Sequence, residues 1–272
     1  MCRGSAHTTG ARRCKQTDDQ RRRANARKRE RYAEQKGNAV NGNGTGTFGV
    51  PQASGMAGGH AAGGQGPLGG GVLGQGHRTG SGPRVLIDGV AVTPVAVHAL
   101  NSATVAAKLQ SEGKSTPHLH ELAPEHAGIF RDKISKLKEN NKYHASVYVY
   151  DEDEYKKMRM FVTDDGEAGI ALKEDGDIVS VFSSKKTKHT APVYSMLATA
   201  VEQGGTKLDC FDTVLPKIYR KMGFAETGRV QWDEQYKPEG WEYETYADYN
   251  NGRPDVVFME HRGFPQEEEL AA

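Results

Sequence analysis

The alternation of apolar and polar residues is informative only from residue 83 onward. Short apolar runs there, separated by turns that contain Gly and Asp, predict β-strands. The predicted strands are residues 85–87, 90–92, 146–150, 158–162, 169–172, 178–182, 228–233 and 255–261, with a further strand ending near Cys210. Asp88-Gly89 lies between the first two runs and favours a two-residue type I′ hairpin turn.

Apolar residues at helical spacing predict helices between these strands. The predicted helices are residues 102–110, 125–140 and 191–203, and a short helix that presents Tyr219. Ser102 provides a hydroxyl at an N-cap position, and Gly113 suits a helix C-terminus. Strands in series, followed by helix, strand and helix, predict an α+β domain with a mixed, mostly antiparallel central sheet flanked by helices. This domain is expected at residues 83–272, with its core at 145–262.

The first third of the chain has a different composition. Residues 1–36 contain 12 Lys and Arg against 4 Asp and Glu, a local charge of +8. Residues 37–82 contain 18 of the 33 glycines and one charged residue, Arg78. Residues 83–272 contain 23 Lys and Arg against 31 Asp and Glu, a charge of −8. This composition predicts a basic, disordered tail joined by a flexible linker to an acidic folded domain.

The basic tail contains a capping-box pattern, Thr17-Asp18-Asp19-Gln20, which predicts a helix over residues 18–35. That helix has almost no apolar face. One hypothesis is a nucleic-acid-binding arm whose basic side chains contact phosphates. These side chains are Arg21, Arg22, Arg23, Arg27, Lys28, Arg29 and Arg31. The alternative is a solvated tail without a specific ligand.

Cys2, His7 and Cys14 precede that helix. Thiolate and imidazole are ligands that zinc prefers, but a structural zinc site needs four of them. Zinc at the N-terminus is therefore one hypothesis, and two reduced thiols are the alternative. Three scattered cysteines do not form a disulfide framework. Because no apolar run approaches the ~20 residues of a membrane span and no secretory signal is evident, we expect a cytoplasmic protein with no membrane partner.

Two prolines, Pro117 and Pro124, bracket a short segment that contains His118 and His120. Bracketing prolines favour a loop, and the histidines do not have the spacing of a helical metal pair. We expect surface histidines in a loop here.

Residues 178–224 follow the order strand, loop, helix, strand, helix and end in Tyr219-Arg220-Lys221-Met222-Gly223-Phe224. This order, with its Tyr-x-x-x-Gly-Phe ending, resembles the acyl-CoA-binding core of the GCN5-related N-acetyltransferase superfamily. The resemblance covers the last third to half of the chain. It implies acetyl-CoA or another acyl-CoA as cofactor and an amine, on a small molecule or a protein, as acceptor.

The resemblance implies a role for Tyr219. Acyl transfer from a thioester needs a polarised carbonyl and a proton for the departing thiolate. Tyr219 stands where many members of the family carry the tyrosine that supplies this proton. The alternative is a core tyrosine whose hydroxyl is bonded within the protein.

The resemblance also implies a pyrophosphate-binding loop at the start of the helix over residues 191–203. Backbone N–H groups and the helix dipole favour an anion at such a helix start. The family pattern Arg/Gln-x-x-Gly-x-Gly/Ala falls on residues 188–193, where Ala191 and Val193 stand at the glycine positions. The cofactor-binding residues implied in this way are Val181, Phe182, Ser183, Lys188, His189, Thr190, Ala191 and Val193. Lys185 and Lys186 add positive charge to the loop.

Two further features bear on the chemistry. Asp212 occupies the region in which the family often carries an asparagine that contacts the cofactor, and an acid there would repel phosphate. An acidic, aromatic segment over residues 232–249 is one candidate wall for a cationic amine, and it contains the predicted substrate-binding residues Trp241, Glu242 and Glu244. The alternative is a surface loop held in place by its rings.

Two functions follow from these observations. The first is an acyl-CoA-dependent N-acyltransferase that uses Tyr219 as general acid. The second is a catalytically inactive copy of the fold, tethered to a tail that binds nucleic acid or another polyanion. The tail-and-linker layout also suggests an accessory protein of a phage or mobile element.

Overall fold

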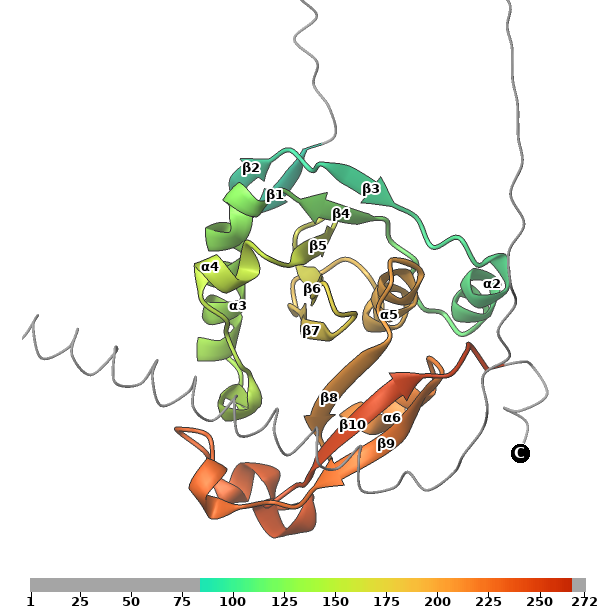
Figure 1. Cartoon of the computed structure of the whole chain (residues 1–272). Helices are drawn as coiled ribbons and strands as arrows, with labels where there is room; N and C mark the ends of the chain where they lie inside the picture. Colours follow the sequence, from blue (N-terminus) through green and yellow to red (C-terminus); the bar gives the residue numbers. More distant parts are fainter. Residues whose placement is uncertain (1–83, 266–272) are drawn as a thin grey trace, which may run out of the picture.

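A computed structural model describes residues 84–265 of the chain (Figure 1). The strands are β1 (Val85–Ile87), β2 (Val90–Val92), β3 (Ala96–His98), β4 (Leu119–Leu122), β5 (Arg159–Thr163), β6 (Ala168–Leu172), β7 (Ile178–Ser183), β8 (Lys207–Phe211), β9 (Phe224–Val230) and β10 (Val256–His261). The α-helices are α2 (Ala103–Ser111), α3 (Ala127–Glu139), α4 (Glu152–Tyr155), α5 (Val193–Glu202) and α6 (Leu215–Arg220). Within the described residues, no helix is long and apolar enough to cross a membrane.

The strands form two main sheets and a hairpin. Five strands pair in the order β3-β4-β5-β6-β7, all antiparallel, and three pair in the order β8-β10-β9, also antiparallel. Strands β7 and β8 run parallel and meet at a single bridge, between Asp177 and Lys207. The predicted α+β class, with a mostly antiparallel sheet flanked by helices, is confirmed.

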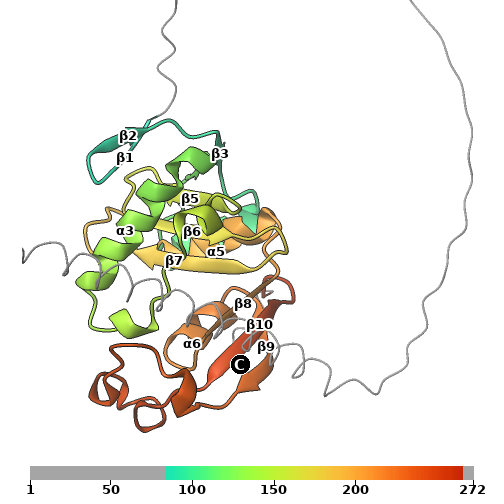
Figure 2. The same cartoon turned by 60° about the vertical axis from the view of Figure 1, so that its left-hand side comes forward.

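Both faces of the five-stranded sheet are buried. Met160, Phe161 and Val162 of β5 are each fully buried, which explains why β5 has a continuous apolar run rather than an alternating one. Phe161 packs in a cluster with residues of α2 and α5, such as Leu197. Met160 and Val162 pack in a second cluster with α3, around Phe130. Figures 1 and 2 show α3 on one face of the sheet and α5 on the other.

The β1–β2 hairpin is fastened to α3 and to the turn between β5 and β6. The ammonium of Lys133, on α3, is buried and lies 2.8 Å from Asp88 in the hairpin and 2.8 Å from Glu167 in the turn. A Cβ on Gly166 would lie 2.2 Å from the carbonyl oxygen of Leu86, so only glycine allows this close approach. These contacts fix the β5–β6 turn, which carries part of the candidate site.

Several sequence predictions for the first half of the domain are confirmed. Asp88 and Gly89 have φ values of 49° and 86°, as a type I′ turn requires. Ser102 caps α2 by accepting a hydrogen bond from the amide of Val105. Helix α3 begins two residues later than expected, after a short 3₁₀ turn at Pro124–His126.

Two predictions were wrong. The segment between Pro117 and Pro124 is not a loop, because β4 forms there and pairs with β3 and β5, and His120 is 8% exposed rather than on the surface. Residues 146–150 do not form a strand. Their apolar residues pack in the cluster that contains α3. Side chains provide part of their backbone hydrogen bonding. Lys138 donates to the carbonyl of Val147, and the Tyr246 hydroxyl accepts from the amide of Ser146.

One of the C-terminal strands differs from expectation at both ends. β9 begins at Phe224, four residues before the predicted start, and ends at Val230, three residues before the predicted end. Its register against β10 shifts between Phe258 and Met259, which explains why its apolar alternation is broken and the start was misplaced.

Candidate cofactor site

The candidate cofactor loop, residues 184–192, connects β7 to α5. Just before it, β7 contains a bulge, because its register against β6 shifts and Ser180 has a φ of 53°. A bulge leaves one residue outside the ladder. The Ser180 hydroxyl is instead within 2.8 Å of the Tyr155 hydroxyl.

The predicted cofactor-binding residues of β7 are partly in the core. Val181 packs against the cluster around α5, whereas Phe182 lies on the other face, with its ring centroid 5.6 Å from that of Phe130. Ser183 is exposed. Val181 and Phe182 can therefore contact a ligand mainly through their backbone.

Asp165 holds the candidate loop against the β5–β6 turn. One of its carboxylate oxygens accepts hydrogen bonds from the Thr163 hydroxyl, at 2.5 Å, and the Glu167 amide, at 3.0 Å. The other accepts from the Thr187 hydroxyl, at 2.8 Å, and the Lys188 amide, at 2.9 Å. Burial opposes ionisation of Asp165, but these four hydrogen bonds outweigh it and lower the pKa of this carboxyl to about 2.

This pKa gives a pH-dependent stability prediction. A carboxyl whose folded pKa lies below its unfolded value stabilises the fold above about pH 4, and the contribution is lost as the pH falls towards 2. Asp165→Asn should lower the free energy of unfolding by about 2 kcal/mol at pH 7 and by roughly half of that at pH 3. Urea unfolding at both pH values measures this difference. Asp132→Asn, on the exposed face of α3, is the control, and an Asp165 effect no larger than its own would contradict the prediction.

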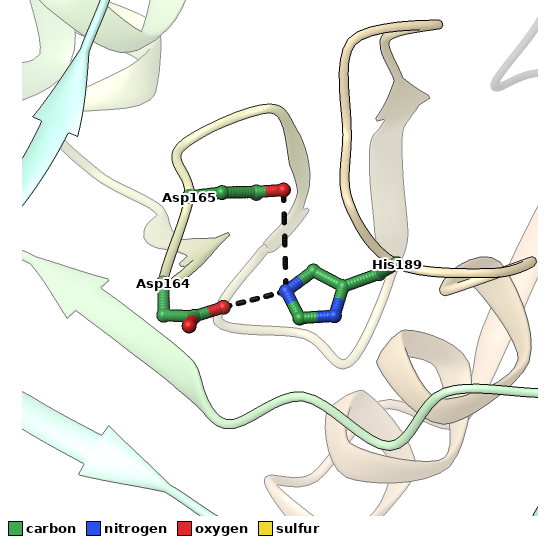
Figure 3. A group of neighbouring side chains, drawn as sticks. All are labelled: Asp164, Asp165 and His189. Carbon is green, nitrogen blue, oxygen red and sulfur yellow. Dashed lines mark hydrogen bonds and ion pairs between the residues drawn. The ribbon is translucent and has the colours of Figure 1, made fainter.

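Asp164 contacts two side chains of the loop, Lys188 and His189, and Figure 3 shows the contact with His189. Its carboxylate lies 2.8 Å from the Lys188 ammonium and 2.6 Å from Nε2 of His189. Burial again opposes ionisation, and the hydrogen bonds from Lys188 and His189 outweigh it and lower the pKa of Asp164. His189 Nε2 is also 4.0 Å from Asp165.

Asp164, Asp165 and His189 place three potential metal ligands within 4.8 Å of one another. The surroundings fit a hydrogen-bonded contact better than a cation site. One oxygen of Asp165 already accepts from two loop donors and the other from two donors of the β5–β6 turn, and the ammonium of Lys188 occupies one oxygen of Asp164. A positive side chain at that distance opposes binding of a divalent cation.

Some backbone N–H groups of the loop donate hydrogen bonds within the described residues, and others do not. The amide of Lys188 donates to Asp165, and that of Thr190 donates to the Ser115 hydroxyl. Pro192 has no N–H. Within residues 84–265, the amides of Ala191 and Val193 at the start of α5 have no hydrogen-bond acceptor. They are the donors through which this helix start could meet an anion.

Ala191 has a backbone conformation that favours glycine. Its φ is 46°, in the left-handed region, and the residue is exposed. A side chain there costs roughly 1–2 kcal/mol. Ala191 is one of the two residues at the glycine positions of the pattern that the resemblance implies.

Ala191→Gly should stabilise the protein by about 0.5 kcal/mol. Relief of the left-handed strain, roughly 1–2 kcal/mol, exceeds the entropy that glycine adds to the unfolded chain, roughly 0.4–1 kcal/mol. The midpoint of urea unfolding measures the change. Ala225→Gly, at an exposed position of β9 without positive φ, should instead destabilise, and equal effects of the two substitutions would contradict the argument.

One lysine side chain contacts the first turn of α5. The ammonium of Lys114 lies 4.1 Å from the ring centroid of Tyr194 and also contacts the carboxylate of Glu112. Burial, and then the positive charges of Lys221 and Lys108, lower the pKa of Lys114. Lys185 and Lys186 are exposed in the loop that precedes the helix.

Tyr219 lies in the core between α6 and the three-stranded sheet and is 6% exposed. Burial raises the pKa of its hydroxyl above the usual range, and the nearby Cys210 and Asp209 add to the shift. The phenol is therefore protonated at neutral pH. Within the described residues its hydroxyl has no hydrogen-bond partner, although the sequence left open a core tyrosine with a bonded hydroxyl.

Asp212, which follows β8, shares one arginine with two other acids. Arg229 of β9 contacts Asp212 and also Glu226 and Asp255. The hydrogen bonds that this guanidinium donates to Glu226 and Asp212 raise its pKa. The expected repulsion between Asp212 and a phosphate is therefore reduced by a neighbour that sequence spacing did not reveal.

The acidic, aromatic segment is built around buried rings. Trp241 is 6% exposed, stacks on Tyr246 with centroids 3.7 Å apart, and donates its indole N–H to the carbonyl of Gly252. Glu242 and Glu244 are exposed. The geometry of Trp241 favours the alternative of a loop held by its rings, and substrate binding by the two glutamates stays a prediction.

Asp164 and Asp165 were not predicted as site residues. The sequence predicted only a turn at Asp164-Asp165-Gly166, and the structure contains that turn. The sequence signal that could have indicated them is a pair of acids in a turn, followed after two strands by a loop rich in lysine. The predicted tail residues Cys2, His7 and Cys14, and the arginines of residues 21–31, lie outside the described residues.

Comparison with known proteins gave no match to a family model, to a curated protein or to a solved structure.

Proposed function

We propose that the domain is an acyl-CoA-dependent N-acyltransferase that acts on an amine. The observation that carries the proposal is the relation between β7 and β8. They run parallel, meet only at Asp177 and Lys207, and otherwise belong to different sheets. One edge of each strand therefore carries backbone groups without a strand partner, next to the helix start of α5.

The edge of β7 suits the extended arm of CoA. An extended chain with amide groups can add to a free strand edge through backbone hydrogen bonds. The bulge at Ser180 releases a further part of the backbone from the ladder, where a thioester carbonyl could be polarised. The free amides of Ala191 and Val193, with the surrounding lysines, would take the pyrophosphate.

Tyr219 would protonate the departing thiolate. A raised pKa makes the phenol of Tyr219 a weaker acid, but burial raises the pKa of a nearby thiol as well. Burial raises the pKa of the neighbouring Cys210 thiol to about 12. A CoA thiolate that departs into a similar environment would be a correspondingly stronger base, so proton transfer from Tyr219 is not strongly uphill.

The test is acyl transfer itself. Purified full-length chain should release free CoA from acetyl-CoA in the presence of polyamines or lysine-containing peptides, and the acceptor should gain one acetyl group by mass. The uncatalysed reaction, measured with heat-denatured protein, is the reference. Release no faster than this reference across primary, aromatic and peptide amines, with acetyl-CoA bound, would contradict the proposed activity.

The second candidate is a non-catalytic binding module whose basic tail contacts nucleic acid. It is favoured by the side chains at both glycine positions and by the engagement of Lys188 and His189 with Asp164. Salt-dependent binding of nucleic acid that disappears when residues 1–36 are deleted would support it. Binding that survives the deletion would leave the tail without this role.

A further inference from the structure

Two side chains expected to bind the cofactor are already paired in the protein. Lys188 and His189 both contact Asp164, at 2.8 and 2.6 Å, and within residues 84–265 no other acid lies closer to either side chain. An anion that approaches the start of α5 therefore meets an ammonium and an imidazole that already contact a carboxylate.

The neighbouring Asp165 has a different role, because its hydrogen bonds are to other groups of the loop and the turn. Its carboxylate is 13% exposed and accepts four hydrogen bonds, two of them from the loop. Asp164 is 41% exposed and Lys188 is 61% exposed. The Asp165 contacts are buried, and the His189 side chain that Asp164 contacts is also only 13% exposed. The contact between Asp164 and Lys188 is at the surface, where a ligand can exchange with it at little cost.

We propose that Asp164 is a resident counter-anion of the loop, which an anionic cofactor must displace from Lys188 and His189, and that Asp165 is the positioning residue that keeps the loop in place meanwhile. The inference rests on the proposed function, because it names what limits cofactor affinity at the same site. Asp164 thereby sets the affinity for CoA, because it holds the Lys188 and His189 side chains near the helix start and competes with phosphate for them.

The physical scale of the effect follows from the charges. An exposed ion pair contributes up to about 1 kcal/mol, and a carboxylate a few ångströms from a phosphate repels it by a similar amount in a partly solvated site. Removing the charge of Asp164 should therefore tighten CoA binding by roughly threefold to thirtyfold. The gain should shrink at high salt, because the groups are exposed.

The experiment compares three Asp→Asn variants of the full chain by calorimetric titration with CoA. Asp164→Asn should bind CoA more tightly than the wild type, and Asp165→Asn should bind it more weakly. Asp132→Asn removes the same charge from α3, away from the loop, and should leave the affinity unchanged. Thermal unfolding of each variant shows whether it is folded at the titration temperature.

The outcomes separate this inference from the proposed function. If the wild type binds CoA and Asp164→Asn binds it equally or more weakly, the counter-anion role is wrong and the acyltransferase proposal stands. If Asp164→Asn and Asp132→Asn increase the affinity for CoA equally, the effect comes from the net charge of the protein, and the inference is wrong. If neither the wild type nor folded Asp164→Asn binds CoA, both proposals are wrong.

Discussion

Tyr219→Phe should lower the rate of acyl transfer by about 100-fold or more, with little change in acetyl-CoA affinity. The substitution removes one oxygen, which we propose donates the proton to the departing thiolate, and a positioned acid contributes roughly 10²–10⁴ to rate. The binding of acetyl-CoA should change little because the ring remains in place. Single-turnover transfer and calorimetric titration of the same preparations measure the two quantities.

The stability of the Tyr219→Phe variant provides an internal control. Because the hydroxyl has no hydrogen-bond partner within the described residues and is not among their fully buried unpaired atoms, its removal should not destabilise the fold. Equal unfolding midpoints would exclude misfolding as the reason for a lower rate. An unchanged rate in a variant that still binds acetyl-CoA would remove Tyr219 from the mechanism.

Gly223→Ala should destabilise the protein by roughly 3 kcal/mol or more, whatever its function. Gly223 has a φ of 82°, and a Cβ there would lie 1.9 Å from the carbonyl oxygen of Gly263. The left-handed backbone alone costs roughly 1–2 kcal/mol for a residue with a side chain. The contact is with backbone, so relief requires a shift of the chain between β9 and the end of β10. Urea unfolding measures the loss.

Gly113→Ala is the matched control for this prediction. Gly113 also has a positive φ, 71°, but nothing lies within 4 Å of a Cβ placed there. It should therefore show only the cost of the backbone conformation. If Gly223→Ala is no more destabilising than Gly113→Ala, then the close approach to Gly263 does not constrain the glycine of the Tyr-x-x-x-Gly-Phe segment.

Local pattern was sufficient for most of the fold. The hairpin at Asp88-Gly89, the capped helix after Ser102 and the buried run of β5 each depend on neighbours in sequence. The errors have a common cause. β4 is short and lies between two prolines, and it forms because it pairs with β3 and β5. Residues 146–150 have the apolar pattern of a strand but pair with no strand. In both places the structure depends on partners distant in sequence.

The candidate site was only partly predictable for the same reason. The sequence placed Lys188, His189 and Ala191 in the loop, because the order of strands and helices fixes that position. It did not indicate that Asp164, 25 residues before His189, contacts the Lys188 and His189 side chains. It also missed the arginine that contacts Asp212. Charge partners across strands depend on sheet register, which the apolar pattern of a single strand does not specify.

Trp241 illustrates a different limit. Aromatic and acidic residues together are typical both of a pocket for a cation and of a small aromatic core with a solvated rim. The stacking of Trp241 on Tyr246, and the hydrogen bond of its indole to Gly252, distinguish the two. No periodicity in residues 232–249 carries that information.

The most direct test of the account is a calorimetric titration of the purified full-length chain with acetyl-CoA. We predict saturable binding of one molecule per chain with a dissociation constant in the micromolar range, weakened by high salt because lysines and free amides carry it. No binding heat at millimolar acetyl-CoA, at two temperatures so that a zero enthalpy is not mistaken for no binding, would contradict the assignment of the β7–α5 loop as a cofactor site.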